Sequence, residues 1–321
     1  MRLARAVFVV LATAVLVSGC AAGPEPEAEA SVVVPFDIDE RFADPDVVAS
    51  DDGYLAFATN VFGLNVVMAS SPDLTDWTVD REDRLPELPA WTSSGKVWAP
   101  EVSADGVGGY ILYFTAEDTA SGRQCIGVAT SGSDAVFSAV SDEPLICPIE
   151  EGGAIDASTF IDDDGTHWLL WKTDGNCCDL DTWIRIAPLS ADGLALAGPS
   201  VDLVKQDLPW EGDLVEAPVL VKHDDTYVLF YSANDYGGDA YAMGAATATS
   251  LTGPYTKLED PILSTRSSDG RYLGPGGQDV ISTPEGDRII FHSWDESYAY
   301  RGMHVASLEW DASTPRVVLP E

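Results

Sequence analysis

Five copies of one short pattern occur in the sequence, and this repetition restricts the fold more than any other feature. Each copy has a polar or small residue, a short apolar run, a turn rich in Asp and Gly, and a second run rich in aromatic and aliphatic residues. Two such runs around an Asp/Gly turn form a β-hairpin. Most copies continue into a third strand that ends in small residues, such as "CIGVATSGSD". The copies begin at Ala43, Trp98, Ile155, Val215 and Gly277.

The spacing of the copies predicts the fold. Aligning them on the residue at the mouth of each hairpin gives steps of 55, 57, 60 and 62 residues between Asp44, Ala99, Asp156, Glu216 and Gln278. A period of this length, with about four strands in each unit, is typical of β-propeller blades. Long helical periodicity is absent. We therefore expect an all-β, five-bladed β-propeller that forms a single domain over residues 36–321. Unrelated hairpins in a sandwich would not explain the even spacing or the repeated third strand.

The N-terminus has the pattern of an export signal. Residues 1–20, "MRLARAVFVVLATAVLVSGC", carry two arginines, an apolar run too short for a stable spanning helix, and small residues before Cys20. Because "LVSGC" resembles a bacterial lipobox, we expect lipidation of Cys20 and anchoring on the outer face of the cell membrane. An ordinary signal peptide and secretion are the alternative. Residues 21–35 are rich in Ala, Pro and Glu, which predicts a solvated tether.

Composition limits the partners of the chain. Hydrophobic residues make up 45% of the sequence, which is enough for a large core, and the formal charge is −36. Binding to phosphates requires clustered Lys and Arg, so the acidic excess argues against nucleic acid and against electrostatic attraction to anionic lipid. We expect a monomer that binds a neutral partner and meets a membrane only through its lipid anchor.

Four cysteines follow the export signal: Cys125, Cys147, Cys177 and Cys178. Disulfides persist in exported proteins, so structural bridges are the favoured interpretation. Four cysteines allow three pairings, and the sequence does not choose between them. No Cys-x-x-Cys spacing indicates a zinc site.

The alignment also brings acids together. The innermost strands of a propeller line a central channel, so equivalent residues of successive blades form a ring around it. This ring would contain Asp44, Asp156 and Glu216. Three crowded carboxylates repel one another, which raises at least one pKa and lets an acid and a base coexist at neutral pH. Glycoside hydrolysis requires such a pair. A calcium site and separate turn-capping roles are the alternatives.

Five short motifs then resemble family 43 of the glycoside hydrolases: "ADPDVV", "VWAPEV", "IDASTFIDDDG", "EGDLVEAPVLVK" and "FHSWD". The resemblance runs from about Phe36 to the C-terminus. It implies a five-bladed propeller that inverts anomeric configuration and releases arabinofuranose or xylose from plant polysaccharides. By position, Asp44 matches the general base, Glu216 the general acid, and Asp156 the acid that tunes and orients it. Competing acids near the same motifs are Asp46, Glu101 and Glu211.

The resemblance also suggests substrate-binding residues, namely Trp98, Asn176, Gln278, His292 and Arg301. Trp98 could stack on a sugar or belong to the core, and Arg301 could contact substrate or form a surface ion pair. His292 matches a histidine near the propeller axis that holds a water or a calcium ion. The family often has a second histidine where this chain has "GPGGQ", which weakens the case for a metal. We expect no required cofactor, with a structural calcium ion near the axis as an option.

The expected function is that of an exported, inverting hydrolase that cleaves terminal α-L-arabinofuranosyl residues from arabinan- or arabinoxylan-type oligosaccharides. A β-xylosidase of the same family would use the same three acids. A sugar-binding propeller without turnover is the alternative from another class. A fructan-acting propeller is a further alternative, but its "NDPNG"-like motif does not match "ADPDV" well. The sequence leaves the sugar, the linkage and the choice between exo and endo action open.

Overall fold

The computed structural model describes residues 33–320. The predicted signal peptide, the lipidation at Cys20 and most of the predicted tether lie outside the described residues. Over residues 33–320, no helix is long and apolar enough to cross a membrane.

Each blade of the molecule is an antiparallel sheet of consecutive strands, and there are five such sheets. The first contains β1 (Asp46–Ser50), β2 (Gly53–Ala58), β3 (Val67–Ser71) and β4 (Thr78–Val79). The second contains β5 (Trp98–Ala104), β6 (Tyr110–Glu117), β7 (Gln124–Ser131) and β8 (Ser138–Ala139). The third contains β9 (Ala154–Ile161), β10 (His167–Thr173), β11 (Trp183–Pro188) and β12 (Val201–Lys205). The fourth contains β13 (Val215–His223), β14 (Thr226–Ala233), β15 (Ala242–Ala248) and β16 (Thr256–Lys257), with β17 (Leu263–Ser264) also paired to β15. The fifth contains β18 (Leu273–Thr283), β19 (Gly286–Trp294), β20 (Arg301–Asp311) and β21 (Thr314–Val317).

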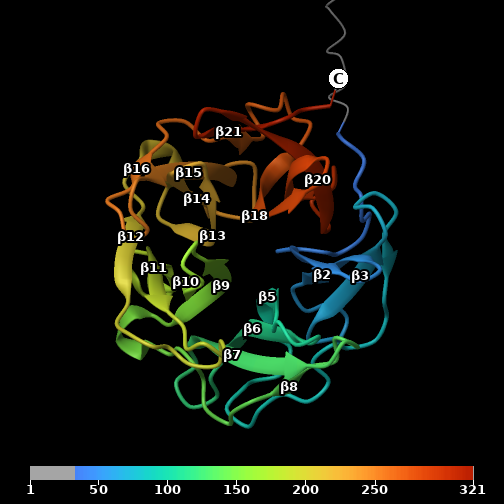
Figure 1. Cartoon of the computed structure of the whole chain (residues 1–321). Helices are drawn as coiled ribbons and strands as arrows, with labels where there is room; N and C mark the ends of the chain where they lie inside the picture. The colour runs from blue at the N-terminus through green and yellow to red at the C-terminus, as the bar shows by residue number, and fades with distance from the viewer. Residues whose placement is uncertain (1–32, 321) are drawn as a thin grey trace, which may run out of the picture. The chain divides into compact units, whose positions relative to one another are not determined.

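The sheets are arranged in a ring around a central axis (Figure 1). The first strand of each sheet packs against the first strand of the next, and β1 also contacts β18, which closes the ring. The prediction of a five-bladed β-propeller is therefore confirmed. Three short 3-10 helices lie in the connections: η1 (Ile149–Glu151), η2 (Gly175–Cys178) and η3 (Pro209–Glu211).

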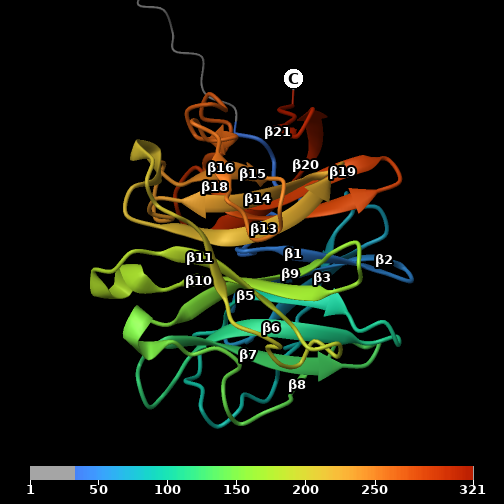
Figure 2. The same cartoon turned by 60° about the vertical axis from the view of Figure 1, so that its left-hand side comes forward.

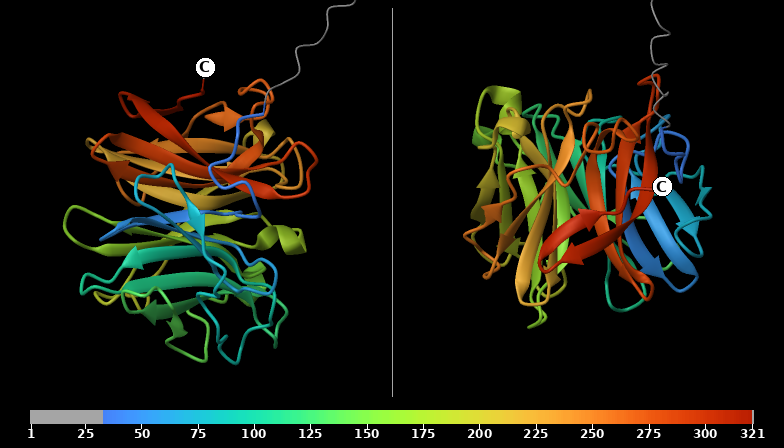
Figure 3. Two further views of the ribbon diagram at one scale, coloured as in Figure 1. Left: turned by 90° about the vertical axis from the view of Figure 1, so that its right-hand side faces the viewer. Right: turned by 90° about the horizontal axis from the view of Figure 1, so that it is seen from above.

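The core lies in the layers between neighbouring blades, whose sheets stack face to face (Figures 2 and 3). Strand β14 is an example, because every residue from Tyr227 to Ala233 is buried. A strand buried on both faces is read in the sequence as a continuous apolar run rather than as an alternation. This explains why "TYVLFYSA" and "YILYFTAE" carry aromatic and aliphatic residues at successive positions.

The ring closes without exchange of a strand between the first and last blades. The segment before β1 pairs instead with β20, where the backbone amides of Asp37 and Ile38 donate to the carbonyl oxygen of Met303 at 2.9 and 3.3 Å. The Met303 amide donates back to Ile38 at 3.1 Å. The side chain of Asp37 accepts a further hydrogen bond from the amide of Val305 at 2.7 Å.

Buried carboxylates join successive blades along the axis. In each case an acid on an inner strand accepts the backbone N–H of the next blade, and we call this set the axial belt. Burial raises the pKa of Asp46 and Glu101, and it raises that of Asp279 to about 7, with the charge of Glu101 adding to the effect at Asp46 and Asp279. The links, each 2.9 Å long, are Asp279 to Val47, Asp46 to Val102, Glu101 to Thr159 and Asp156 to Ala217.

Candidate active site

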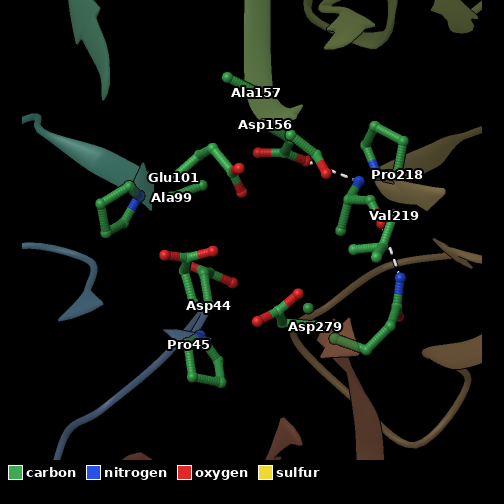
Figure 4. A pocket seen from close by; sticks show the side chains of 15 residues that line it. Asp44, Pro45, Ala99, Glu101, Asp156, Ala157, Pro218, Val219 and Asp279 are labelled. Atoms are coloured by element: carbon green, nitrogen blue, oxygen red, sulfur yellow. Dashed lines mark hydrogen bonds between the residues drawn. The ribbon is translucent and has the colours of Figure 1, made fainter. Parts of the chain in front are cut away.

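A cavity of about 650 Å³ lies at the N-terminal ends of the inner strands β5, β9 and β13. The three acids singled out in the sequence, Asp44, Asp156 and Glu216, all line it. A much smaller and deeper space continues from it between Asp44, Asp156 and the axial belt (Figure 4). The structure therefore brings the three predicted acids together in one cavity.

The backbone corrects the alignment of the ring. A left-handed backbone conformation recurs at the corresponding position of the inner segment of every blade, with φ between 40° and 56° at Asp44, Ala99, Asp156, Ala217 and Gly277. These residues are structurally equivalent, so the sequence alignment was wrong by one residue in the last two blades. Glu216 comes one residue before the equivalent position, and Gln278 comes one residue after it. A β-bulge between Glu216 and Val219 accompanies this position in the fourth blade.

Asp44 is held as an ionised carboxylate. The hydroxyl of Thr59 donates to its Oδ2 at 2.6 Å, and a guanidinium nitrogen of Arg301 lies 3.3 Å from its Oδ1. Burial alone would raise the pKa of Asp44, but the Arg301 charge and the Thr59 hydrogen bond hold it below its usual value. A carboxylate that is ionised and faces a cavity can accept a proton from water, which is the task of a general base.

His292 supports Asp44 from behind. Its Nδ1 accepts the backbone N–H of Asp44 at 3.0 Å, so the ring proton of the neutral imidazole is assigned to Nε2. Burial and then the neighbouring charge of Arg301 lower the pKa of His292 to about 3. With Nδ1 accepting the Asp44 amide and Nε2 carrying the ring proton, the neutral imidazole of His292 has no free lone pair for a cation. These residues do not fit a calcium ion at His292.

Two predicted substrate contacts need correction. His292 is fully buried and Gln278 is 4% exposed, and neither lines the catalytic cavity. Gln278 accepts a hydrogen bond from Ser232 at 2.7 Å and donates to the carbonyl oxygen of Ala217 at 2.6 Å, which joins the fifth blade to the fourth. The motifs placed both residues near the axis, but side-chain packing turned them into the protein. Over residues 33–320, no group of three or more His, Cys, Asp or Glu side chains is arranged to hold a metal ion.

Both carboxylate oxygens of Glu216 are engaged. Lys172 donates to Oε2 at 3.0 Å and the hydroxyl of Tyr241 donates to Oε1 at 2.8 Å. Lys172 is 1% exposed and also lies 3.4 Å from Asp174. Burial alone would lower the pKa of Lys172, but the charges of Glu216 and Asp174 raise it above its usual value, so the ammonium stays charged. Glu216 is therefore fixed in position by a cation and a phenol.

Asp156 is the acid with the raised pKa. Burial, followed by the charge of Glu216, raises the pKa of Asp156 to about 8. Asp156 therefore retains its proton at neutral pH. The cavity thus contains one carboxyl, Asp156, that retains a proton and one, Asp44, that does not. Such a separation of pKa values assigns acid and base chemistry to different sides of a site.

The sequence reading missed Lys172, Tyr241 and Thr59. Lys172 had a visible signal, because it is the one charged residue in the otherwise apolar strand "HWLLWKT" apart from the histidine at its start. Thr59 and Tyr241 had none, since a Thr after a strand and a Tyr before one are common. Their roles depend on contacts between residues far apart in the sequence, such as that of Tyr241 with Glu216 within the fourth blade.

Three further predicted residues do line the cavity, namely Trp98, Asn176 and Arg301. The Arg301 guanidinium lies over the ring of Tyr236 at 4.8 Å, which fixes its plane. Asn176 lies in η2, beside a disulfide between the adjacent Cys177 and Cys178. The other disulfide joins Cys125 to Cys147. The structure thus selects one of the pairings that the sequence left open.

The competing acids are structural. Asp46 and Glu101 belong to the axial belt, and Glu211 is fully buried. The Oε1 atom of Glu211 lies 2.7 Å from the ammonium of Lys257 and accepts the hydroxyl of Tyr231 at 2.8 Å. None of these three acids lines the catalytic cavity.

Comparison with characterised proteins identifies relatives of moderate similarity. The chain is 28% identical to a β-D-galactofuranosidase of Aspergillus niger over 70% of its length and 64% of that protein. It is 25% identical to an extracellular endo-α-(1→5)-L-arabinanase of Bacillus subtilis, with 86% and 87% covered. It is 24% identical to an extracellular exo-α-(1→5)-L-arabinofuranosidase of Streptomyces avermitilis, with 90% and 62% covered. The chain thus spans slightly less than two thirds of two of these relatives.

The fold has close counterparts among solved structures. A thermostable family-43 glycoside hydrolase superposes with a TM-score of 0.75 at 27% identity, covering 90% of this chain and 95% of the other. The sequence model of glycosyl hydrolases family 43 matches residues 38–314, which include β1 to β20 and the three predicted acids Asp44, Asp156 and Glu216. The chain belongs to glycosyl hydrolases family 43.

Proposed function

We propose that this protein hydrolyses α-L-arabinofuranosidic bonds with inversion of configuration and releases terminal residues from arabinan- or arabinoxylan-type oligosaccharides. The observation that carries the proposal is the division of the cavity acids into an ionised Asp44 and a protonated Asp156 that lies beside Glu216. All three relatives described above act on furanosides or arabinan according to their names, which supports a five-membered sugar ring as the substrate.

In this mechanism each group has one task. Asp44 removes a proton from a water molecule as its oxygen attacks the anomeric carbon. Glu216 gives its proton to the glycosidic oxygen as the bond between that oxygen and the anomeric carbon breaks. Asp156 stays protonated and so places no second negative charge beside Glu216, while Lys172 and Tyr241 hold Glu216 in place. The sugar leaves with inverted configuration, and solvent restores the two proton positions.

Two other functions can be compared with the same set of cavity acids. A β-xylosidase would place the same acids around a six-membered ring, and the acids do not distinguish the two sugars. A sugar-binding propeller without turnover would not need a retained proton, so the raised pKa of Asp156 favours an enzyme. No cofactor enters the proposed reaction, and the substrate is a neutral oligosaccharide or polysaccharide.

The proposal predicts both the sugar and the stereochemistry. Aryl α-L-arabinofuranoside should be cleaved with a higher kcat/KM than the matching aryl β-xyloside or β-galactofuranoside. Proton NMR recorded within the first minutes should show the inverted anomer of arabinose, because water attacks opposite the leaving group. A first product with retained configuration would exclude the assigned roles of Asp44 and Glu216, whereas a preference for the xyloside would change only the sugar.

We also propose that the protein is exported and anchored through a lipid on Cys20, because "LVSGC" is followed by a polar, acidic segment. Two of the relatives are named as extracellular enzymes, which supports export. Cells fed radioactive fatty acid should label the wild-type protein and not the Cys20→Ala variant. Equal labelling of both would show that the protein is not a lipoprotein.

A further inference from the structure

A second cavity, of about 300 Å³, adjoins the catalytic one on the side of Asp44. It lies where the first blade meets the fifth and shares Thr59 and Arg301 with the catalytic cavity. These two residues also contact the carboxylate of Asp44. Lys172 and Tyr241, which bind the carboxylate of Glu216, do not line the second cavity. The second cavity is therefore an extension on the side of the general base.

The walls of this cavity combine aromatic faces with hydrogen-bond donors. Phe62, Trp294 and Tyr300 provide the aromatic rings, and Arg41 and Arg301 provide the guanidinium groups. No carboxylate lines it, whereas six carboxylate side chains line the catalytic cavity. Apolar rings with a few convergent donors are the usual lining of a site for a small organic ligand. For a sugar, the rings can cover C–H faces while the guanidinium groups donate to hydroxyl oxygens.

The walls are held before any ligand arrives. Trp294 donates through its indole nitrogen to the carbonyl oxygen of Tyr236 at 2.7 Å. The hydroxyl of Tyr300 donates to the carboxylate of Asp39. Arg41 donates to the carbonyl oxygen of Ala299 at 2.9 Å, which ties the first blade to the loop before β20. Preformed walls reduce the side-chain entropy that the protein must lose when a sugar binds.

A structural role does not explain the exposure or the backbone conformation of Phe62. Its side chain is 82% exposed, the highest value for an aromatic residue in the described part of the chain. It occupies the first central position of a tight turn in which Val61 and Leu64 exchange two backbone hydrogen bonds, at 3.2 and 2.9 Å. Its φ is 50°, and that of the following Gly63 is 88°.

A turn of this kind prefers Asn-Gly at its centre, because both residues need a positive φ. A bulky side chain in the left-handed region is strained, and strain of this kind is concentrated at functional sites. The turn thus presents a strained and exposed ring at the rim of a cavity. The cation–π contact with Arg41, at 5.9 Å, leaves most of this ring uncovered.

We propose that this second cavity is a glycone-side subsite, in which Phe62 stacks on the sugar that precedes the one being cleaved off. The inference rests on the proposed function, because it requires Asp44 as base and Glu216 as acid. The leaving group must lie at Glu216, so a pocket beyond Asp44 receives the other end of the substrate. The enzyme then accepts a glycone of two linked sugars and releases a disaccharide as well as a single arabinose.

The test compares two substrates that share a leaving group. An aryl α-L-arabinofuranoside has one glycone sugar, and the matching aryl α-L-arabinobioside has two. The wild-type enzyme should have a kcat/KM about tenfold higher for the bioside, since the second sugar covers one face of an aromatic ring. The Phe62→Asn variant should lose this advantage and keep its activity on the single-sugar substrate.

Replacing Phe62 with Asn removes the aromatic ring without disturbing the turn. Asn is favoured at this turn position, so the melting temperature of Phe62→Asn should be equal to or above that of the wild type. Val107→Asn is the matched control, because Val107 is 90% exposed on a different blade and should change neither substrate's kcat/KM. An unchanged bioside advantage in Phe62→Asn would overturn the subsite.

A binding measurement tests the subsite independently of hydrolysis. Trp294 lines the cavity, so its fluorescence should respond to arabinotriose or xylotriose in the wild type, with about tenfold weaker binding in Phe62→Asn. That result without any turnover would uphold the subsite and refute the hydrolase. Equal binding by both proteins would refute the subsite whether or not the enzyme turns over.

Discussion

Asp44→Asn should lower kcat/KM by about 10²- to 10⁴-fold for every substrate, whatever its leaving group. The asparagine keeps the shape of the side chain and can still accept the Thr59 hydrogen bond, but it cannot take a proton from water. Attack by water occurs in the same step as bond cleavage in an inverting enzyme, so a better leaving group does not compensate. Steady-state kinetics on a series of aryl glycosides measures this directly.

A matched variant controls for effects on charge and folding. Asp51 lies in the exposed turn of the same blade, so Asp51→Asn removes the same charge far from the cavity. It should leave kcat/KM unchanged within a factor of two or so. Near-full activity in Asp44→Asn would mean that Asp44 is not the base, and the assignment of the whole cavity would fail.

Glu216→Gln should show the opposite dependence on the leaving group. It removes the proton donor, so substrates with poor leaving groups should lose about 10²- to 10⁴-fold, while activated aryl glycosides are partly spared. The hydrogen bond from Tyr241 to Oε1 can persist in the amide, which limits displacement of the side chain. A plot of log kcat/KM against leaving-group pKa should therefore become steeper than in the wild type. An unchanged slope would assign proton donation to Asp156 instead.

The pH profile tests the role of Asp156. Burial, followed by the charge of Glu216, raises the pKa of Asp156 to about 8, so Asp156 keeps its proton until the pH rises through that range. Wild-type activity should fall on the basic side as this proton is lost. Asp156→Asn removes the carboxyl that titrates in this range, so the basic limb of the variant should no longer lie near pH 8. A basic limb that stays in place would show that Asp156 does not set it.

Much of the site could be predicted from the sequence because a propeller repeats. Repetition places equivalent residues around one axis, so the blade spacing was enough to bring Asp44 and Asp156 into one cavity without any knowledge of contacts. Glu216 was also identified, although the alignment placed it one residue off. An equivalent register shift occurs in the second blade, between Trp98 and Glu101, so the offset arose because the alignment matched polar residue types rather than backbone positions.

Other features depended on three-dimensional packing. Asp46, Glu101 and Glu211 resembled the catalytic acids in sequence, and only their burial and hydrogen bonds show that they hold the fold together. His292 and Gln278 lie near the axis as expected, but their side chains are buried and do not line the catalytic cavity. A position near the axis is therefore not sufficient for contact with the cavity. Lys172 reaches Glu216 from a neighbouring blade, and no local pattern encodes a contact across 44 residues of sequence.

The sequence by itself thus determined the architecture, the number of blades and the three acids. Strand periodicity and repeat spacing depend only on the order of residues along the chain, so they are visible without the structure. The tertiary structure decided which acid keeps a proton, which residues face the cavity, and where a second sugar can lie. Those outcomes depend on burial and on charges from different blades. Desolvation and charge–charge interactions depend on the distances between residues of different blades. Those distances are fixed only when the ring of blades has closed.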